Sequence, residues 1–69
     1  MDNENKFKKY QVVKHLKSGN EYVIKKVPDE DDRLEYCNES YYQYVSPIDG
    51  IKWNRRKSEM EDGRFELVK

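Results

Sequence analysis

Side chains that could carry chemistry are sparse in this chain. It has a single histidine, His15, and a single cysteine, Cys37. Covalent catalysis needs a base held beside its nucleophile, and no sequence signature links these two residues. A small β-rich domain rarely encloses the pocket that such a pair would need. We therefore predict that the protein is not an enzyme, with Cys37 as a small core residue and His15 on a strand surface.

An acidic run, Asp29–Asp32, follows Pro28. Sites for hard cations need oxygen ligands at alternating positions and usually a glycine for the bend, and this run has neither. We predict an exposed loop, with no metal and no cofactor. Docking of a basic partner and mimicry of phosphates remain open alternatives for the run.

The only three-residue basic run is Arg55, Arg56 and Lys57, beside the single tryptophan Trp53. Aromatic faces stack on rings, and arginine forks bind phosphate or carboxylate. Because large aromatic residues mostly supply burial, we favour Trp53 as a core residue over a contact residue. For Arg55 and Arg56, ligand binding and pairing with a nearby carboxylate both stay open.

Three tyrosines alternate along one predicted strand, with Tyr42 and Tyr44 on one face and Tyr41 on the other. A domain this small cannot bury both faces, so at least one tyrosine should be exposed. Tyrosine is enriched at interfaces, which predicts binding of a partner or self-association through this strand. The candidate binding residues are Tyr41, Tyr42, Tyr44, Trp53, Arg55, Arg56, Lys57 and Arg64.

Short runs of β-forming residues separated by turn residues predict the elements that hold these side chains. The expected strands are residues 10–16, 21–27, 34–45 as one irregular strand or two, 51–55 and 64–68. Tyr22, Ile24 and Val27 are the inward candidates of the second strand. Residues 57–62 predict one helical or 3₁₀ turn, with Ser58 as its N-cap, and Asn38 predicts a bulge or bend.

These elements predict an all-β fold, either a small SH3-like barrel or a strongly bent antiparallel sheet of four or five strands, with the short helical turn before the last strand. Residues 1–6 are expected to be a flexible N-terminus, and residues 7–69 a single small β-domain.

The composition argues against several classes of protein, among them membrane-spanning and secreted proteins. The 69 residues make one domain, and the 14 basic and 14 acidic residues cancel, so no general attraction to nucleic acid or to an anionic membrane is expected. A single cysteine predicts a reducing compartment. No apolar run approaches the ~20 residues of a membrane span, and the first residues are unlike a signal peptide. We expect a cytoplasmic protein without membrane contact.

Residues from about Tyr10 to Phe65 resemble a family of short bacterial and phage domains of unassigned activity. The matching motifs are a Gly-x-x-Tyr hairpin strand at Gly19–Tyr22, a Trp-x-Arg segment at Trp53–Arg55, and a closing methionine and phenylalanine within Glu59–Phe65. The family often has proline where this chain has Arg56. The resemblance implies an SH3-like fold and a phage or prophage origin, and it implies no activity.

The leading interpretation is a non-enzymatic binding module of the phage accessory type, which engages a host protein surface or itself through an aromatic and arginine face. The alternative is binding of a nucleotide or nucleic acid, including a nucleotide-sequestering oligomer, by stacked aromatics and by Arg55, Arg56, Lys57 and Arg64.

Overall fold

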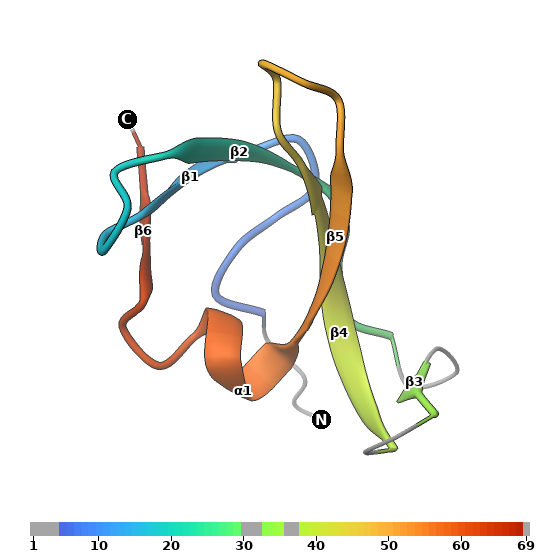
Figure 1. Ribbon diagram of the computed structural model, residues 1–69. Helices are drawn as coiled ribbons and strands as arrows, with labels where there is room; N and C mark the ends of the chain where they lie inside the picture. The colour runs from blue at the N-terminus through green and yellow to red at the C-terminus, as the bar shows by residue number, and fades with distance from the viewer. Residues whose placement is uncertain (1–4, 30–32, 36–37, 69) are drawn as a thin grey trace.

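The computed structural model describes residues 5–29, 33–35 and 38–68 (Figure 1). Six strands and one helical turn follow one another along the chain. They are β1 (Val12–His15), β2 (Glu21–Lys26), β3 (Arg33–Leu34), β4 (Glu39–Val45), β5 (Lys52–Arg56), α1 (Lys57–Met60) and β6 (Phe65–Leu67).

All strand pairs are antiparallel, in the order β3-β4-β2-β1-β6, with β5 paired to β4. β1, β2 and β6 bend away from the long β4–β5 hairpin, and α1 lies at the open end between them (Figure 1). Within the described residues β5 and β6 each pair with one strand only. The prediction of a strongly bent antiparallel sheet with a helical turn before the last strand is therefore confirmed, and the sheet is not a closed barrel.

Gly19 and Asn38 are turn residues with a positive φ, and of their two hairpins only the one at Gly19 was predicted. Gly19, with a φ of 78°, lets the chain reverse between β1 and β2. Asn38 has a φ of 52°, and its N–H donates to the carbonyl of Leu34 at 2.7 Å. It closes the β3–β4 turn, so the predicted strand 34–45 is two strands with a bend at Asn38.

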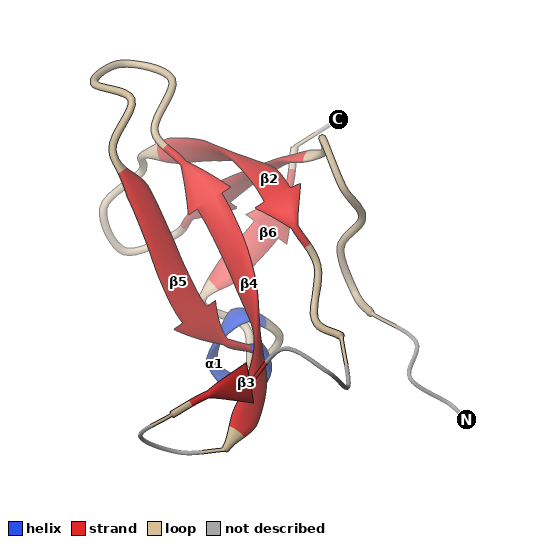
Figure 2. Ribbon diagram, turned by 90° about the vertical axis from the view of Figure 1, so that its right-hand side faces the viewer, coloured by secondary structure: helices blue, strands red, loops and turns tan. Residues whose placement is uncertain are grey.

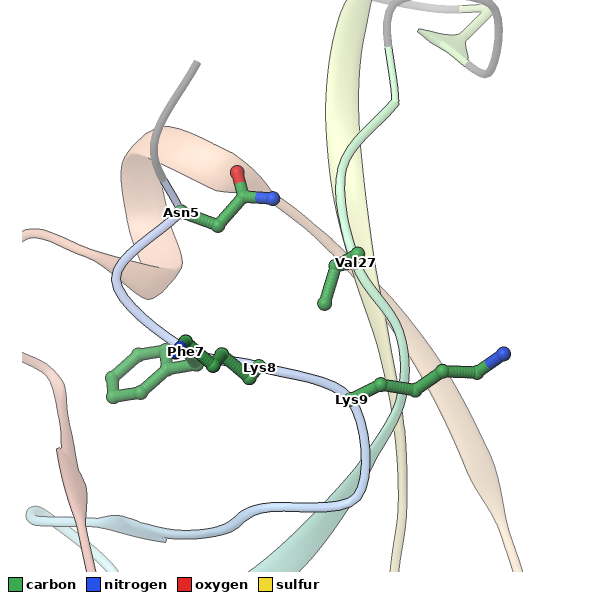
Figure 3. Close-up of a pocket in the computed structure, with 5 residues that line it drawn as sticks. All are labelled: Asn5, Phe7, Lys8, Lys9 and Val27. Carbon is green, nitrogen blue, oxygen red and sulfur yellow. The ribbon is translucent and has the colours of Figure 1, made fainter. Parts of the chain in front are cut away.

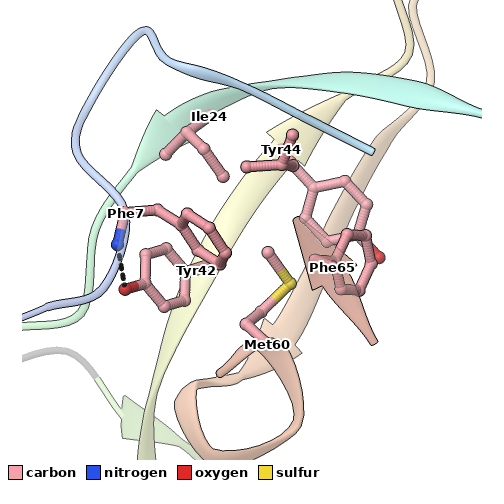
Figure 4. Close-up of a cluster of buried hydrophobic side chains, with 7 residues drawn as sticks. Phe7, Ile24, Tyr42, Tyr44, Met60 and Phe65 are labelled. Atoms are coloured by element: carbon pink, nitrogen blue, oxygen red, sulfur yellow. Dashed lines mark hydrogen bonds between the residues drawn. The ribbon is translucent and has the colours of Figure 1, made fainter. Parts of the chain in front are cut away.

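The core lies on the concave side of the sheet (Figure 4). Alternation along β4 turns Tyr42 and Tyr44 inward, and Ile24 of β2 meets them across the ladder. Tyr22 and Val27 pack against the cluster, so the inward residues predicted for β2 are confirmed. The buried cluster consists of Phe7, Val13, Ile24, Tyr42, Tyr44, Met60 and Phe65.

Trp53 is not part of this core. Its side chain is 49% exposed, so the prediction of Trp53 as a core residue is wrong. The reason is its position, because β5 lies at the outer edge of the sheet beside β4 (Figure 2). The inner tyrosines of β4 supply the aromatic bulk that the sequence analysis assigned to the tryptophan.

The helical turn begins at Lys57, the first residue of the predicted range, and its N-cap lies two residues before the predicted one. Arg56 is its N-cap residue and makes no side-chain capping bond, so the assignment of Ser58 as N-cap is wrong. The N–H of Ser58 instead donates to the Glu39 carboxylate at 3.0 Å. A side chain from β4 thus satisfies an N-terminal N–H group of the helix, and α1 in turn places Met60 fully inside the core.

Candidate functional site

The eight predicted binding residues do not form one surface. In the β4–β5 register, Tyr44 lies opposite Trp53, Tyr42 opposite Arg55, and Tyr41 opposite Arg56. Because side chains alternate between faces, the first two pairs share the concave face and the third pair lies on the outer face. The single aromatic and arginine face of the sequence analysis is therefore divided between both sides of the sheet.

Tyr42 and Tyr44 are 0% and 3% exposed. Their assignment as surface anchors is wrong, because the inward face of β4 is the centre of the core. The ring of Tyr44 contacts Tyr22 and Phe65, with ring centroids 5.0 and 5.5 Å apart. Its hydroxyl accepts a hydrogen bond from Arg55 Nε at 3.1 Å, and this bond raises the pKa of Arg55 above its ordinary value.

The buried hydroxyl of Tyr42 ties the N-terminal segment to the helical turn. It accepts from the Phe7 N–H at 3.1 Å (Figure 4), and it donates to Glu61 Oε2 at 2.5 Å. Lys57 Nζ and the Lys6 N–H also donate to Glu61, at 2.8 and 2.9 Å. We call these five residues the Tyr42 clasp. Lys57, predicted to bind a ligand, has a structural role here.

The clasp also shifts the pKa values of Tyr42 and Glu61. Burial, reinforced by the bond with Glu61, raises the pKa of Tyr42. Burial alone would raise the pKa of Glu61 as well. The hydrogen bonds that its carboxylate accepts, with that from Lys57 first among them, outweigh burial and hold the pKa below its ordinary value.

The predicted arginines converge on one carboxylate, Glu59. Arg55 Nη1 lies 3.2 Å from Glu59 Oε1, Arg56 pairs with the second oxygen, and Arg64 Nη1 lies 3.8 Å from the first. Arg64 Nε also pairs with Asp62 at 3.1 Å. The hydrogen bond from Arg56 lowers the pKa of Glu59, against the opposing effect of burial. Of the two alternatives left open for Arg55 and Arg56, the structure therefore shows pairing with a carboxylate.

Trp53 and Arg55 border a hollow on the concave face, between β5 and the β1–β6 side of the sheet. The hollow has a volume of about 100 Å³ and is lined by His15, Tyr22, Tyr44, Trp53, Arg55 and Phe65. A wider hollow of about 520 Å³ shares two of these residues and is lined by His15, Leu16, Lys17, Arg55, Gly63 and Arg64. We call the first the Trp53 hollow. Of the predicted residues, Tyr44, Trp53 and Arg55 line the Trp53 hollow, and Arg55 and Arg64 line the wider one.

Sequence reasoning missed His15 and Tyr22 as lining residues of the Trp53 hollow. His15 is two positions after the buried Val13 and therefore points to the same face of β1. Its ring packs on Phe65 with centroids 4.9 Å apart, and its Nδ1 bonds Ser18 Oγ at 2.8 Å. The period-2 pattern of β1 puts His15 on the face of Val13 and is the signal that could have found it.

The outer edge of β5 is open. The Ser46 N–H donates to the Ile51 carbonyl at 3.0 Å, which fixes the alternation of the antiparallel ladder. The backbone groups of Trp53 and Arg55 therefore point toward β4, and those of Lys52 and Asn54 point away from it. Within the described part of the chain, no strand pairs with this edge.

A further hollow, of about 440 Å³, lies between the N-terminal segment and the end of β2 (Figure 3). It is lined by Asn5, Phe7, Lys8, Lys9 and Val27. The Phe7 ring turns away from Val27 into the core, so the hollow presents backbone and lysine stems rather than converging polar groups. We assign no ligand to it.

Two other sequence predictions fall partly outside the described residues. Cys37 lies outside them, as do residues 30–32 of the acidic run, while Asp29 is exposed. Among the residues that the structure describes, no group of three His, Cys, Asp or Glu side chains could hold a metal ion. No helix in the described ranges is long and apolar enough to cross a membrane.

Comparison with protein-family models, with curated proteins and with solved structures found no match for this chain. The resemblance to short bacterial and phage domains therefore stays a prediction.

Proposed function

We propose that the protein is a non-enzymatic binding module that takes up an extended, acidic segment of another protein along the edge of β5. This proposal rests on the open edge of β5, where the backbone groups of Lys52 and Asn54 point away from β4. The half-exposed Trp53 lies between these two residues. An extended peptide can add a strand to such an edge, where main-chain hydrogen bonds give affinity and side-chain pockets give specificity.

Trp53 is suited to anchor that segment. It lies between the two outward-facing backbone positions, and its side chain borders the Trp53 hollow. Ile51 shares its face of the strand and is also 49% exposed. Tryptophan is the residue type most often found among binding hot spots, because its large ring is desolvated on contact. An apolar side chain of the added strand would cover both residues.

The charges beside β5 favour an acidic segment. Three arginines, Arg55, Arg56 and Arg64, meet the carboxylates of Glu59 and Asp62, and the exposed Lys52 adds a further cation on β5. Opposite charges on neighbouring strands stabilise a pair, and like charges destabilise it. Carboxylates of a partner strand would meet this excess of positive charge.

The same charges disfavour a second copy as the added strand. An antiparallel β5–β5 pair centred on Asn54 would place Lys52 of each copy opposite Arg56 of the other. Both side chains lie on the outer face, at positions where like charges repel. A different protein therefore fits the edge better than self-association does.

The nucleotide alternative fits this face less well. At about 100 Å³ the Trp53 hollow is smaller than the 300–1,000 Å³ typical of small-molecule sites. The arginines assigned to phosphate are already paired with Glu59. A phosphate would have to compete with that carboxylate, whereas an added strand leaves the pairs in place.

The setting of the proposal comes from the sequence. A single cysteine favours a reducing cytoplasm, and the resemblance to bacterial and phage domains favours a host-cell protein as the partner. Both statements are part of the proposal, and identification of the partner would test them.

A peptide selection tests the proposed edge. A displayed library of random extended peptides is panned against the protein, and the selected peptides are measured by calorimetry. We expect them to carry carboxylates around an apolar residue, and to lose at least tenfold in affinity with Trp53→Ala, since a hot-spot residue supplies about 2 kcal/mol or more.

Matched variants distinguish main-chain pairing at the β5 edge from binding through side chains alone. Asn54→Pro removes the outward N–H of the edge while leaving the bonds to β4, and proline is tolerated at edges, so binding should be lost. Asn54→Ala keeps that N–H and should bind. Tyr10→Asn removes an exposed aromatic ring from another part of the surface and should also bind. Peptides that bind Asn54→Pro as tightly as the wild type would contradict the proposal.

A further inference from the structure

Charge is strongly segregated along a chain whose net charge is zero. Residues 5–28, which form the N-terminal segment, β1 and β2, contain one acidic residue, Glu21, and no arginine. The same range holds the lysines Lys6, Lys8, Lys9, Lys14, Lys17, Lys25 and Lys26. A local positive field of this kind attracts polyanions even when the whole molecule is neutral.

A β-bulge gathers two of these lysines on the outer face. Ile24 pairs with Tyr44, but Lys26 pairs with Gln43, so the register shifts between residues 24 and 26. In a bulge two residues oppose one on the partner strand, and here Lys25 and Lys26 both extend outward. Gln43 is an outer-face residue of β4, as is Tyr41.

Each of these lysines lies over a tyrosine ring. Lys25 Nζ is 5.7 Å from the centroid of Tyr10, and Lys9 Nζ is 5.5 Å from the same centroid. Lys26 Nζ is 5.3 Å from the centroid of Tyr41 and donates to its hydroxyl at 3.2 Å. Lys9, Tyr10 and Lys25 form one cation–ring group, and Lys26 and Tyr41 form a second. Lys25 and Lys26 are neighbours in the chain, and we call the five residues the lysine–tyrosine patch.

Tyr10 is held in an unfavourable conformation. Its φ is 73°, a region that a bulky residue rarely occupies, and its side chain is 67% exposed. The backbone is fixed there by the Tyr10 N–H, which donates to the Ile24 carbonyl at 2.7 Å. Glycine or asparagine would fit this turn with less strain. Residues held in such a sparsely populated backbone conformation cluster at functional sites.

We propose that the lysine–tyrosine patch binds single-stranded nucleic acid, with bases stacked on Tyr10 and Tyr41 and phosphates contacting Lys9, Lys25 and Lys26. An exposed cation–π contact is weaker than the stacking of a base on an aromatic ring. Lys9 and Lys25 can therefore swing from the Tyr10 ring to a phosphate while a base takes their place. An acidic polypeptide would use the ammonium groups and leave both rings unused.

This site is independent of the β5 edge. The patch residues come from the N-terminal segment, β2 and the outer face of β4, whereas Trp53 lies on the concave face. Trp53→Ala should leave binding of nucleic acid unchanged, so the two proposals can fail separately.

Binding of a fluorescein-labelled oligothymidylate of about 12 nucleotides tests the patch. Fluorescence anisotropy at low salt should detect a complex. The logarithm of its association constant should fall with the logarithm of salt concentration with a slope of about −2, as expected for three lysine–phosphate contacts on a single strand.

Three variants locate the site. Lys25→Ala combined with Lys26→Ala should weaken binding at least tenfold. Tyr10→Asn should weaken it about fivefold or more through the lost stacking, without lowering the melting temperature, because asparagine tolerates a positive φ. Lys14→Ala is the matched control. It removes one charge from the same face, but Lys14 lies opposite Glu21 and Glu66 and outside the patch, so its effect should be less than twofold.

A ligand control tests the role of the bases. An abasic strand of equal length presents the same phosphates without rings, and polyglutamate presents charge alone. We expect both to bind at least tenfold more weakly than oligothymidylate. Equal binding of either polymer, no binding of oligothymidylate at low salt, or an equal loss with Lys14→Ala would overturn the assignment.

Discussion

At the scale of single residues, the Tyr42 hydroxyl is the polar centre of an otherwise apolar core. It satisfies the Phe7 N–H and the Glu61 carboxylate at once. Removing a hydroxyl from such a network costs more than one average hydrogen bond, because both partners are left without it. The residue that the sequence analysis treated as a contact is thus one that holds the N-terminal segment in place.

Tyr42→Phe should lower the free energy of unfolding by about 1–3 kcal/mol while keeping the ring in the core. Urea denaturation followed by circular dichroism measures this loss. Tyr41→Phe is the matched control, because its hydroxyl lies on the outer face, where it accepts a hydrogen bond from Lys26 Nζ at 3.2 Å; it should change stability by less than about 0.5 kcal/mol. Equal losses for the two variants would contradict a special role for the clasp.

Glu61 should make stability depend on pH in a defined direction. Its pKa is lowered in the folded protein, so its contribution is complete above its unfolded pKa of about 4.3 and is lost as pH falls through the folded pKa. Glu61→Gln should therefore be less stable than the wild type by about 1 kcal/mol at neutral pH, allowing for partial exposure.

The difference between these two proteins should shrink as the pH falls below about 4. Urea denaturation at a series of pH values measures it, and every other carboxylate is common to both proteins and cancels. A difference that stays constant across the series would show that Glu61 contributes packing rather than charge.

At the scale of elements, short segments outside the sheet complete the core. Phe7 belongs to the N-terminal segment and Met60 to the single turn of α1, yet they are 1% and 0% exposed. The Phe7 ring meets Tyr42 edge-on with centroids 5.9 Å apart. A bent sheet that does not close needs side chains from other segments to fill its open side, and these two supply them.

This arrangement predicts an unusual order of stability effects. Phe7→Ala should cost about 3–5 kcal/mol and Met60→Ala about 2–5 kcal/mol, the usual range for buried side chains. Trp53→Ala, at a half-exposed edge position, should cost less than about 1 kcal/mol. Thermal and urea unfolding of the three variants gives the comparison. A larger loss for Trp53→Ala than for Phe7→Ala would contradict the described core.

The strands were predictable because their signals are local. Alternation along residues 21–27 placed Ile24 inward, and glycine and asparagine at turns placed the hairpins. What alternation does not reveal is whether a strand lies at an edge. It grouped Trp53 with Arg55 on one face of β5, but the pairing with Tyr44 and the half-open position of that face follow only from the strand order.

The candidate site was predictable in part for the same reason. Arg55 and Arg64 were identified from their charge, but their shared partner Glu59 depends on how α1 folds back beside β5. Lys25 and Tyr10 lie far apart in sequence and meet through the bulge and the turn at residues 8–11. Contacts of this kind follow from tertiary structure and leave no periodic signal.

At the scale of the whole molecule, the two proposed surfaces lie on opposite faces of one sheet. The concave side and the β5 edge carry Trp53 and the paired arginines, and the outer face carries the lysine–tyrosine patch. A small protein with two separate binding surfaces is able to bring a protein segment and a nucleic-acid strand together. That combined role follows only if both proposals hold.

The protein should be a monomer at micromolar concentration, because Lys52 and Arg56 oppose self-pairing of β5. Sedimentation gives the mass, and emission of the single tryptophan reports its environment on the same sample. We expect a monomer with the red-shifted emission of a half-exposed Trp53. A stable dimer with blue-shifted emission would place Trp53 in a self-interface instead.

The most direct test of the β5 edge is amide hydrogen exchange, measured residue by residue with and without a selected acidic peptide. In the unbound protein the amides of Trp53 and Arg55, which point toward β4, should be protected, and those of Lys52 and Asn54 should exchange fast. Peptide binding should protect Lys52 and Asn54. Protection of these two amides in the unbound protein, or no change on binding, would contradict strand addition at β5.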